Sequence, residues 1–284
     1  MWKYIIKRLL NMIPLLLGIT FIAFMVFQLA PGDYFTKLEL DPNISPELLQ
    51  SMREDFALDK PPIVQYFIWL KQVVMGNMGL SFQYQIPVWD LIKSKLLNTF
   101  ILSLAAVFVT WMLAIPFGVL SAVKQYQVAD KMTAFVAFLG MSLPNFFLAF
   151  LMLYWVAQTG VLPVGGMEHP FHHMLSPWQK MMDVLNHLIL PTFVLAMASL
   201  ASLLRIMRGN MLEVLGAKFM LAARAKGVAE HGVIFKHALR NAINPMITIF
   251  GYELANLFSG AALVEMILRW PGMGQLMLDA ALNQ

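Results

Sequence analysis

The chain has 284 residues, of which 59% are hydrophobic and 13% are charged. Because a soluble domain usually carries about 25% charged residues, this composition excludes an ordinary water-soluble fold and indicates an integral membrane protein. The net charge of +4 comes from basic residues in separate short segments, which does not indicate nucleic-acid binding, and the lack of cysteine excludes disulfides, thiol catalysis and cysteine metal sites.

Five stretches with at most one charge each have the roughly 20 residues that a helix needs to cross the hydrocarbon core. The first is longer than the apolar region of a secretion signal, about 7–15 residues, and no small-residue cleavage site follows it. We therefore expect an all-α, multi-pass bundle. The predicted spans are 9–30, 96–123, 132–156, 184–204 and 241–264.

Lysine and arginine are distributed unevenly between the segments that join these spans. Segments 1–8, 124–131 and 205–240 carry twelve of them, whereas 165–183 and 265–284 carry two. Because short cytoplasmic loops are enriched in basic residues, we expect a cytoplasmic N-terminus and a location in the inner (plasma) membrane.

Residues 1–95 are predicted to form a first region, consisting of the first span and an outer segment. The outer segment, 31–95, holds eight acidic and six basic residues, which favours exposure to water. Asp59-Lys60-Pro61-Pro62 breaks the chain, 64–74 reads as a short amphipathic helix, and the glycines in 76–79 indicate a turn.

The basic segment between the last two spans is long for a connection within a bundle. Glu213 to Lys226 is helical in composition, and Gly227 stands where a helix would end in a left-handed turn. His231 to Arg240 reads as a second helical piece, and Asn244-Pro245 can start the fifth span. One interpretation is a docking element outside the membrane; the other is a solvated basic loop.

Motifs for chemistry are largely absent. The sequence has no phosphate-binding G-x-x-x-x-G-K-[ST] loop, no nucleophile elbow and no H-E-x-x-H, so we expect no catalytic residues and no cofactor. Glu253 is the one carboxylate within a predicted span; it could face a transport path or be hydrogen-bonded between helices. His169, His172 and His173 could bind a transition metal, but a solvated loop is the stronger interpretation, and no metal site is predicted.

Several ordered motifs carry a family resemblance over nearly the whole chain. The stretch Ala222–Gly227, with His237–Ala242 and Pro245 after it, resembles the coupling region of oligopeptide/dipeptide-type ABC transporter permeases, which are binding-protein-dependent inner-membrane components with the MetI-like fold. Leu221 stands where the general form of this loop has glutamate. Further similar segments are Ala30–Asp33, Leu58–Pro61, Gln65-Tyr66, Gly76–Ser81, Ser142–Phe146, Leu162–Gly166, Leu190-Pro191, Arg205 with Arg208, and Trp270–Gly274.

The resemblance implies a type I ABC importer permease domain over 96–284, with a cytoplasmic coupling region at 213–240. It implies these partners: a second homologous permease, two ABC ATPase subunits that hydrolyse ATP, an extracytoplasmic substrate-binding protein and membrane lipid. Glu253 is the candidate for the substrate path. The residues expected to contact the ATPase are Phe219, Ala222, Ala223, Arg224, Ala225, Lys226, Gly227, His237, Arg240 and Asn241.

The expected substrate is a di- or oligopeptide, with nickel, opines or sugars as alternatives. The rival classes are a secondary transporter driven by an ion gradient, with Glu253 as proton site, and a membrane-embedded enzyme that uses the histidines. The secondary transporter would need inverted repeats, and the sequence shows none. Members of the family usually have a sixth span after the Trp-Pro-Gly loop, so we expect the complete permease to continue past Gln284.

Overall fold

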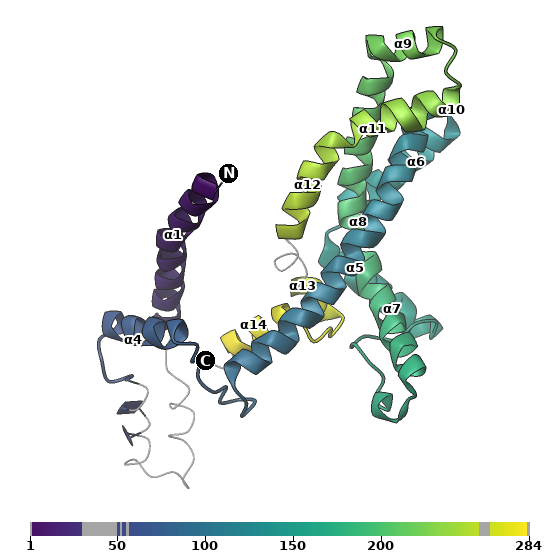
Figure 1. The fold of residues 1–284 in the computed structure, drawn as a ribbon. Coiled ribbons are helices and arrows are strands. Elements are labelled where there is room, and N and C mark those ends of the chain that lie inside the picture. The colour runs from purple at the N-terminus through teal and green to yellow at the C-terminus, as the bar shows by residue number, and fades with distance from the viewer. Residues whose placement is uncertain (1, 30–49, 52, 55–56, 256–261, 283–284) are drawn as a thin grey trace. The chain divides into compact units, whose positions relative to one another are not determined.

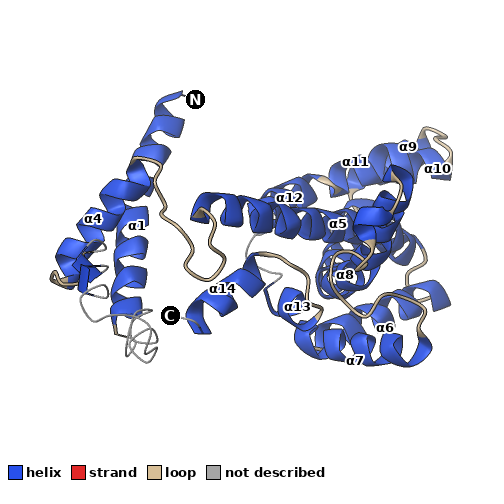
Figure 2. Ribbon diagram, turned by 90° about the horizontal axis from the view of Figure 1, so that it is seen from below, coloured by secondary structure: helices blue, strands red, loops and turns tan. Residues whose placement is uncertain are grey.

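The computed structural model shows helices joined by loops, and no strand occurs in the part of the chain that it describes (Figure 2). The chain divides into two compact units, Met1–Leu91 with Asp279–Gln284, and Ile92–Leu278. We call them unit 1 and unit 2 and describe each by itself. The described residues are 2–29, 50–51, 53–54, 57–255 and 262–282.

Unit 1 consists mainly of two helices, α1 (Trp2–Gln28) and α4 (Pro62–Val74), and α4 lies across the end of α1 (Figure 1). Pro62 starts α4, a position where its missing N–H costs nothing. This confirms the short helix predicted at 64–74. Gly76 and Gly79 both have positive φ, which confirms the turn predicted after it.

Three described helices are long and apolar enough to cross a membrane: α1, α5 (Val88–Val123) and α8 (Pro177–Leu215). At about 1.5 Å per residue, the 39 residues of α8 extend about 58 Å, nearly twice the hydrocarbon thickness of about 30 Å. The helix therefore continues well beyond the predicted span 184–204. A bundle of apolar helices without strands confirms the predicted fold class.

The span predicted at 132–156 does not form one continuous helix. The structure has two helices there, α6 (Val128–Ser142) and α7 (Asn145–Thr159), which are bent by 102° from each other. The cause is Pro144, which lacks an N–H and forces Leu143 into an extended conformation (φ −101°, ψ 123°). If the pair is counted as one broken span, the described residues contain up to four spans.

The fifth predicted span, 241–264, does not occur as one long described helix. The chain forms α11 (Leu239–Ala242) and α12 (Asn244–Ala255), and then α13 (Ala262–Ile267) and α14 (Met273–Leu282). Helix α12 begins at Asn244 with Pro245 in its first turn, as predicted. The rest of the predicted span at 256–261 lies outside the described residues, as does the Ala30–Asp33 motif.

The core of unit 2 forms around α8. Its methionines Met207 and Met211 are fully buried among side chains of α5 and α11. Two glycines allow neighbouring helices to come close: a Cβ at Gly118 of α5 would lie 2.7 Å from the Met207 Cβ, and one at Gly140 of α6 would lie 2.7 Å from the Met197 carbonyl oxygen. Small residues at such crossings are typical of helix packing in membranes.

An ion pair joins the start of α6 to α8. Arg208 donates two hydrogen bonds to the Asp130 carboxylate, at 2.7 and 2.8 Å. Asp130 also accepts from the Ser121 hydroxyl and the Tyr126 backbone N–H, and its side chain is only 7% exposed. The turn between α5 and α6 is thereby held against α8 by a fully hydrogen-bonded carboxylate.

We predict that Arg208→Ala destabilises the protein by about 3 kcal/mol, because it leaves a buried carboxylate without its cation. In detergent, the variant should unfold several degrees below the parent protein. The matched control is Arg205→Ala, which removes an exposed arginine one turn earlier on α8. Equal melting of the two variants would show that the Asp130–Arg208 pair does not stabilise this junction.

Candidate functional site

A two-part helical element follows α8 and forms one end of unit 2, opposite the loop that follows α7 (Figure 1). The first part is α9 (Lys218–Ala225). After it, Gly227 adopts φ +73°, its N–H donates to the Arg224 carbonyl at 2.9 Å, and the Val228 N–H donates to the Ala223 carbonyl at 3.3 Å. These bonds define a Schellman turn and confirm the helix end predicted at Gly227.

The second part is helical, as predicted for His231–Arg240. It consists of α10 (Glu230–Gly232), the π-helical turn η2 (Val233–Ala238) and α11. Its Val233 and Ala238 side chains are fully buried together with Met220 of α9 and the methionines of α8. Because all three side chains join the core around α8, the element is attached to that helix rather than being a solvated loop.

The turn between the two parts is closed by Arg224, which donates to both carboxylate oxygens of Glu230 at 2.9 and 3.1 Å. The adjacent guanidinium lowers the pKa of Glu230 below its usual value. Both side chains are well exposed, so we expect this pair to fix the geometry of the turn rather than to add much stability.

Most residues predicted to contact the ATPase lie on the surface of this element. Phe219 and Leu221 are 49% and 62% exposed, large apolar side chains directly beside the buried Met220. Ala223 and His237 are half-buried instead. The exposed members of the predicted set are Phe219, Ala222, Arg224, Ala225, Lys226, Gly227, Arg240 and Asn241.

Glu253 lies on α12 and accepts a hydrogen bond of 2.7 Å from the Trp111 indole N–H of α5. The Phe250 ring contacts the Trp111 ring edge-to-face at 5.0 Å between centroids. The carboxylate is half-buried, and no basic side chain forms an ion pair with it among the described residues. Glu253 is therefore hydrogen-bonded between helices, as one of the two interpretations expects, and its place on a transport path stays a prediction.

The sequence reasoning missed Glu265, which is fully buried. The Thr99 hydroxyl of α5 donates to one carboxylate oxygen at 2.6 Å, and the Gly274 N–H donates to the other at 2.7 Å. Thr99 in turn accepts from the Met273 N–H at 2.8 Å. Glu265 therefore holds the Trp-Pro-Gly loop against α5. No local signal in the sequence marks Glu265, because its partner Thr99 lies 166 residues earlier in the chain.

Trp270 of the same loop is also fully buried. Its indole N–H donates to the Asn98 carbonyl, and the Asn98 amide donates to the Pro271 carbonyl, each at 3.0 Å. On the other side of the loop, the Gly166 N–H donates to the Leu268 carbonyl at 2.9 Å. These hydrogen bonds connect the loop to two other segments of unit 2.

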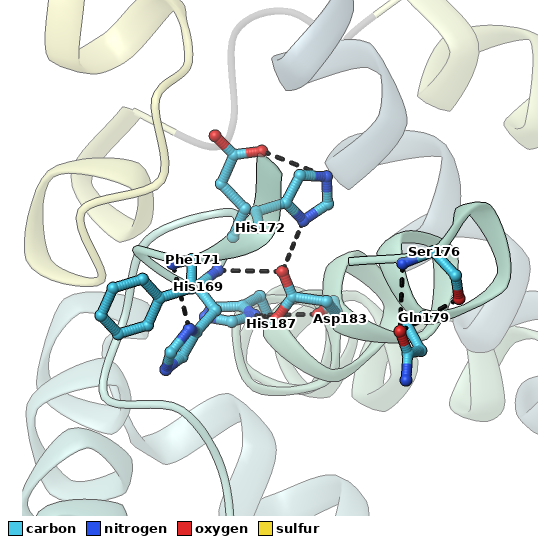
Figure 3. Close-up of polar contacts among 8 residues, drawn as sticks. His169, Phe171, His172, Ser176, Gln179, Asp183 and His187 are labelled. Carbon is cyan, nitrogen blue, oxygen red and sulfur yellow. Dashed lines mark hydrogen bonds and ion pairs between the residues drawn. The ribbon is translucent and has the colours of Figure 1, made fainter. Parts of the chain in front are cut away.

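Asp183 of α8 contacts the His172 ring and the His169 backbone in the loop before α8, and also His187 of α8 (Figure 3). The His172 Nδ1 lies 2.6 Å from one Asp183 carboxylate oxygen, which also accepts from the His169 backbone N–H, and the His187 Nδ1 lies 3.2 Å from the other. His172 Nε2 is 3.5 Å from Glu168. Within the described residues, no group of three potential ligands is placed to hold a metal ion. The cluster instead closes the loop onto α8.

These features define a helical membrane transport component, in which an external element is attached to a long spanning helix. Residues 114–284 match the family described as binding-protein-dependent transport system inner membrane component, and residues 1–105 match its N-terminal region. The chain belongs to this family, whose members work in ABC transporter complexes with other subunits.

Curated relatives cover almost the whole chain. It is 42% identical over 286 residues to the oligopeptide transport system permease protein AppB of Bacillus subtilis, covering 100% of this chain and 89% of that protein. It is 36% identical over 284 residues to a putative peptide permease protein of Brucella ovis, covering 99% and 87%. It is 33% identical over 297 residues to the dipeptide transport system permease protein DppB of Escherichia coli K12, covering 99% and 88%.

We predict that Gly272→Ala destabilises the Trp-Pro-Gly loop by about 1–3 kcal/mol, since the new methyl group would collide with the Glu265 carboxylate. The readout is the midpoint of thermal unfolding in detergent. The control is Gly251→Ala on α12, where an added methyl group meets nothing within 4 Å. If both variants melted like the parent protein, the Glu265 contact would not constrain the loop.

Proposed function

We propose that this protein is the membrane-spanning permease subunit of an ATP-driven ABC importer for di- and oligopeptides. The observation that carries the proposal is the element 218–242, whose buried side chains attach it to α8 and whose surface exposes Phe219 and Leu221 on either side of the buried Met220. Large exposed apolar side chains on a firmly held element fit a docking partner. The names of the relatives, which specify oligopeptide and dipeptide transport, support the substrate class.

The complex would contain a second homologous permease, two ABC ATPase subunits and an extracytoplasmic substrate-binding protein. ATP hydrolysis belongs to the ATPase subunits, and the permease carries out no bond chemistry. The distribution of basic residues supports a cytoplasmic N-terminus in the inner membrane, with 205–240 on the cytoplasmic side. Closure of the ATPases would then act on α9, and the packing of Met220 against α8 would pass the movement to the helix bundle as a rigid-body shift.

The test uses the absence of native cysteine. Ala225 is exposed on α9, so Ala225→Cys should form a disulfide with a cysteine placed in the groove of the ATPase subunit that receives α9. The measurement is the crosslinked product on a non-reducing gel, made from a complex that still transports.

Ser176→Cys, in the loop before α8, is the control on the opposite end of unit 2. It should react with a membrane-impermeant thiol reagent in intact cells and form no crosslink to the ATPase. Absence of crosslinks along the whole of 218–240, or labelling of Ala225→Cys but not of Ser176→Cys from outside, would contradict the proposed coupling or its orientation.

We place Glu253 on the substrate path, where its carboxylate would attract the protonated amine of a peptide. Removing one charge-assisted hydrogen bond costs about 1.5–3 kcal/mol, so Glu253→Gln should weaken the apparent affinity for transported peptide about tenfold or more. The measurement is uptake by the reconstituted complex over a range of peptide concentrations. Tyr252→Phe, an exposed neighbour on α12, is the control, and unchanged uptake by Glu253→Gln would remove Glu253 from the path.

A further inference from the structure

Helix α4 of unit 1 has three distinct faces. Tyr66, Trp69 and Val73 are spaced by three and four residues and form the face toward α1, where Tyr66 is buried. Gln65 and Gln72 lie on a second, polar face. The third face is an apolar stripe with helical spacing that no described residue covers. The stripe consists of Ile63, Phe67, Leu70 and Val74, and three of its four side chains are exposed.

The stripe is conspicuous in size. Phe67 is 61% exposed, Val74 is 79% exposed and Ile63 is 57% exposed. Had α4 been surrounded by water, as the charge of segment 31–95 predicts, these side chains would form a large unfavourable surface on a helix of 13 residues. The surroundings of α4 can be inferred from the level along α1 at which it is attached, because that level sets its depth in the membrane.

That depth is fixed by the Tyr66 side chain. Its hydroxyl donates to the Leu17 carbonyl at 3.1 Å and lies 3.0 Å from the Thr20 hydroxyl. The rings of Phe21 and Phe24 contact the Tyr66 ring at centroid distances of 5.1 and 5.7 Å. The polar end of Tyr66 is thus satisfied by α1 itself, as a hydroxyl away from water must be.

Thr20 lies in the middle of the uncharged stretch that carries α1 through the membrane, and its level is therefore near the middle of the hydrocarbon core. Gln28, at the end of α1, donates to the Gln65 side chain of α4 at 2.7 Å. The eight residues from Thr20 to Gln28 rise about 12 Å along the helix. Helix α4 is therefore held between the bilayer centre and the membrane surface, in the leaflet where α1 ends.

We propose that α4 is an interfacial helix that lies in the boundary between headgroups and acyl chains, with its apolar stripe in contact with lipid acyl chains. The apolar side chains of α1, to which α4 is attached, are also uncovered within the described chain. An amphipathic helix of this kind buries its apolar face about 5–10 Å into the boundary, which agrees with the attachment between Thr20 and Gln28.

The remaining side chains of α4 suit this position. Trp69 is 40% exposed, and tryptophan is enriched at membrane–water interfaces. Lys71 is exposed on the side away from α1, one turn from Phe67 at the edge of the stripe, where its long side chain can extend to the headgroups. Gln65 and Gln72 lie at the other edge of α4, where Gln65 is hydrogen-bonded to Gln28 at the end of α1.

The experiment is nitroxide spin labelling of single cysteines in the assembled transporter, reconstituted in phospholipid vesicles. Phe67→Cys and Val74→Cys report on the stripe, and Gln72→Cys on the polar face is the matched control. All three positions are exposed, so the label should not disturb packing. Relaxation is measured with oxygen, which partitions into lipid, and with a water-soluble nickel chelate.

We expect the ratio of oxygen to nickel accessibility to be severalfold higher at positions 67 and 74 than at position 72. High nickel accessibility at 67 and 74 would place α4 in water and overturn the proposal. Low accessibility to both reagents at 67 and 74 would show that another protein surface, such as a second permease subunit, covers the stripe, and would overturn it too. None of these outcomes depends on the transported substrate, so the result is independent of the proposed function.

Discussion

The packing of α8 against its neighbours is the constraint on which unit 2 depends. A backbone inside lipid must satisfy its own hydrogen bonds, so the chain crosses as helices, and α8 is long enough to leave the membrane at both ends. At one end Asp183 holds the loop that contains His172. At the other end Met207 and Met211 pack against the side chains of the element 218–242. A displacement of this element is therefore a displacement of α8.

Buried carboxylates act as structural junctions in unit 2. Asp130 has a cation, a hydroxyl and a backbone N–H as partners, and Glu265 has a hydroxyl and a backbone N–H. In both cases two partners come from other helices, and losing either would leave a costly unsatisfied group. Glu253 differs, because it is half-buried with one indole donor. That difference is why Glu253, rather than Asp130 or Glu265, is the residue proposed for the path.

Several elements could be predicted from the sequence, because the residues that start or end them lie at their own boundaries. Gly227 had to end α9, since a left-handed turn favours glycine, and Pro62 and the glycines after Val74 bounded α4. Hydropathy alone could not locate the break at Leu143-Pro144, because apolar residues continue on both sides of it. Glu265 was missed for another reason: its role depends on Thr99, which is 166 residues away in the chain. Only the tertiary structure brings them together.

If this protein is an ATP-driven importer subunit, energy enters through the element 218–242 and not through an ion gradient. The most direct measurement is peptide uptake into proteoliposomes that contain this subunit, its partner permease, the two ATPases and the binding protein. The account predicts accumulation that requires ATP and continues after ionophores have collapsed the proton and sodium gradients. Uptake that continues without ATP and stops when the gradients are collapsed would contradict it.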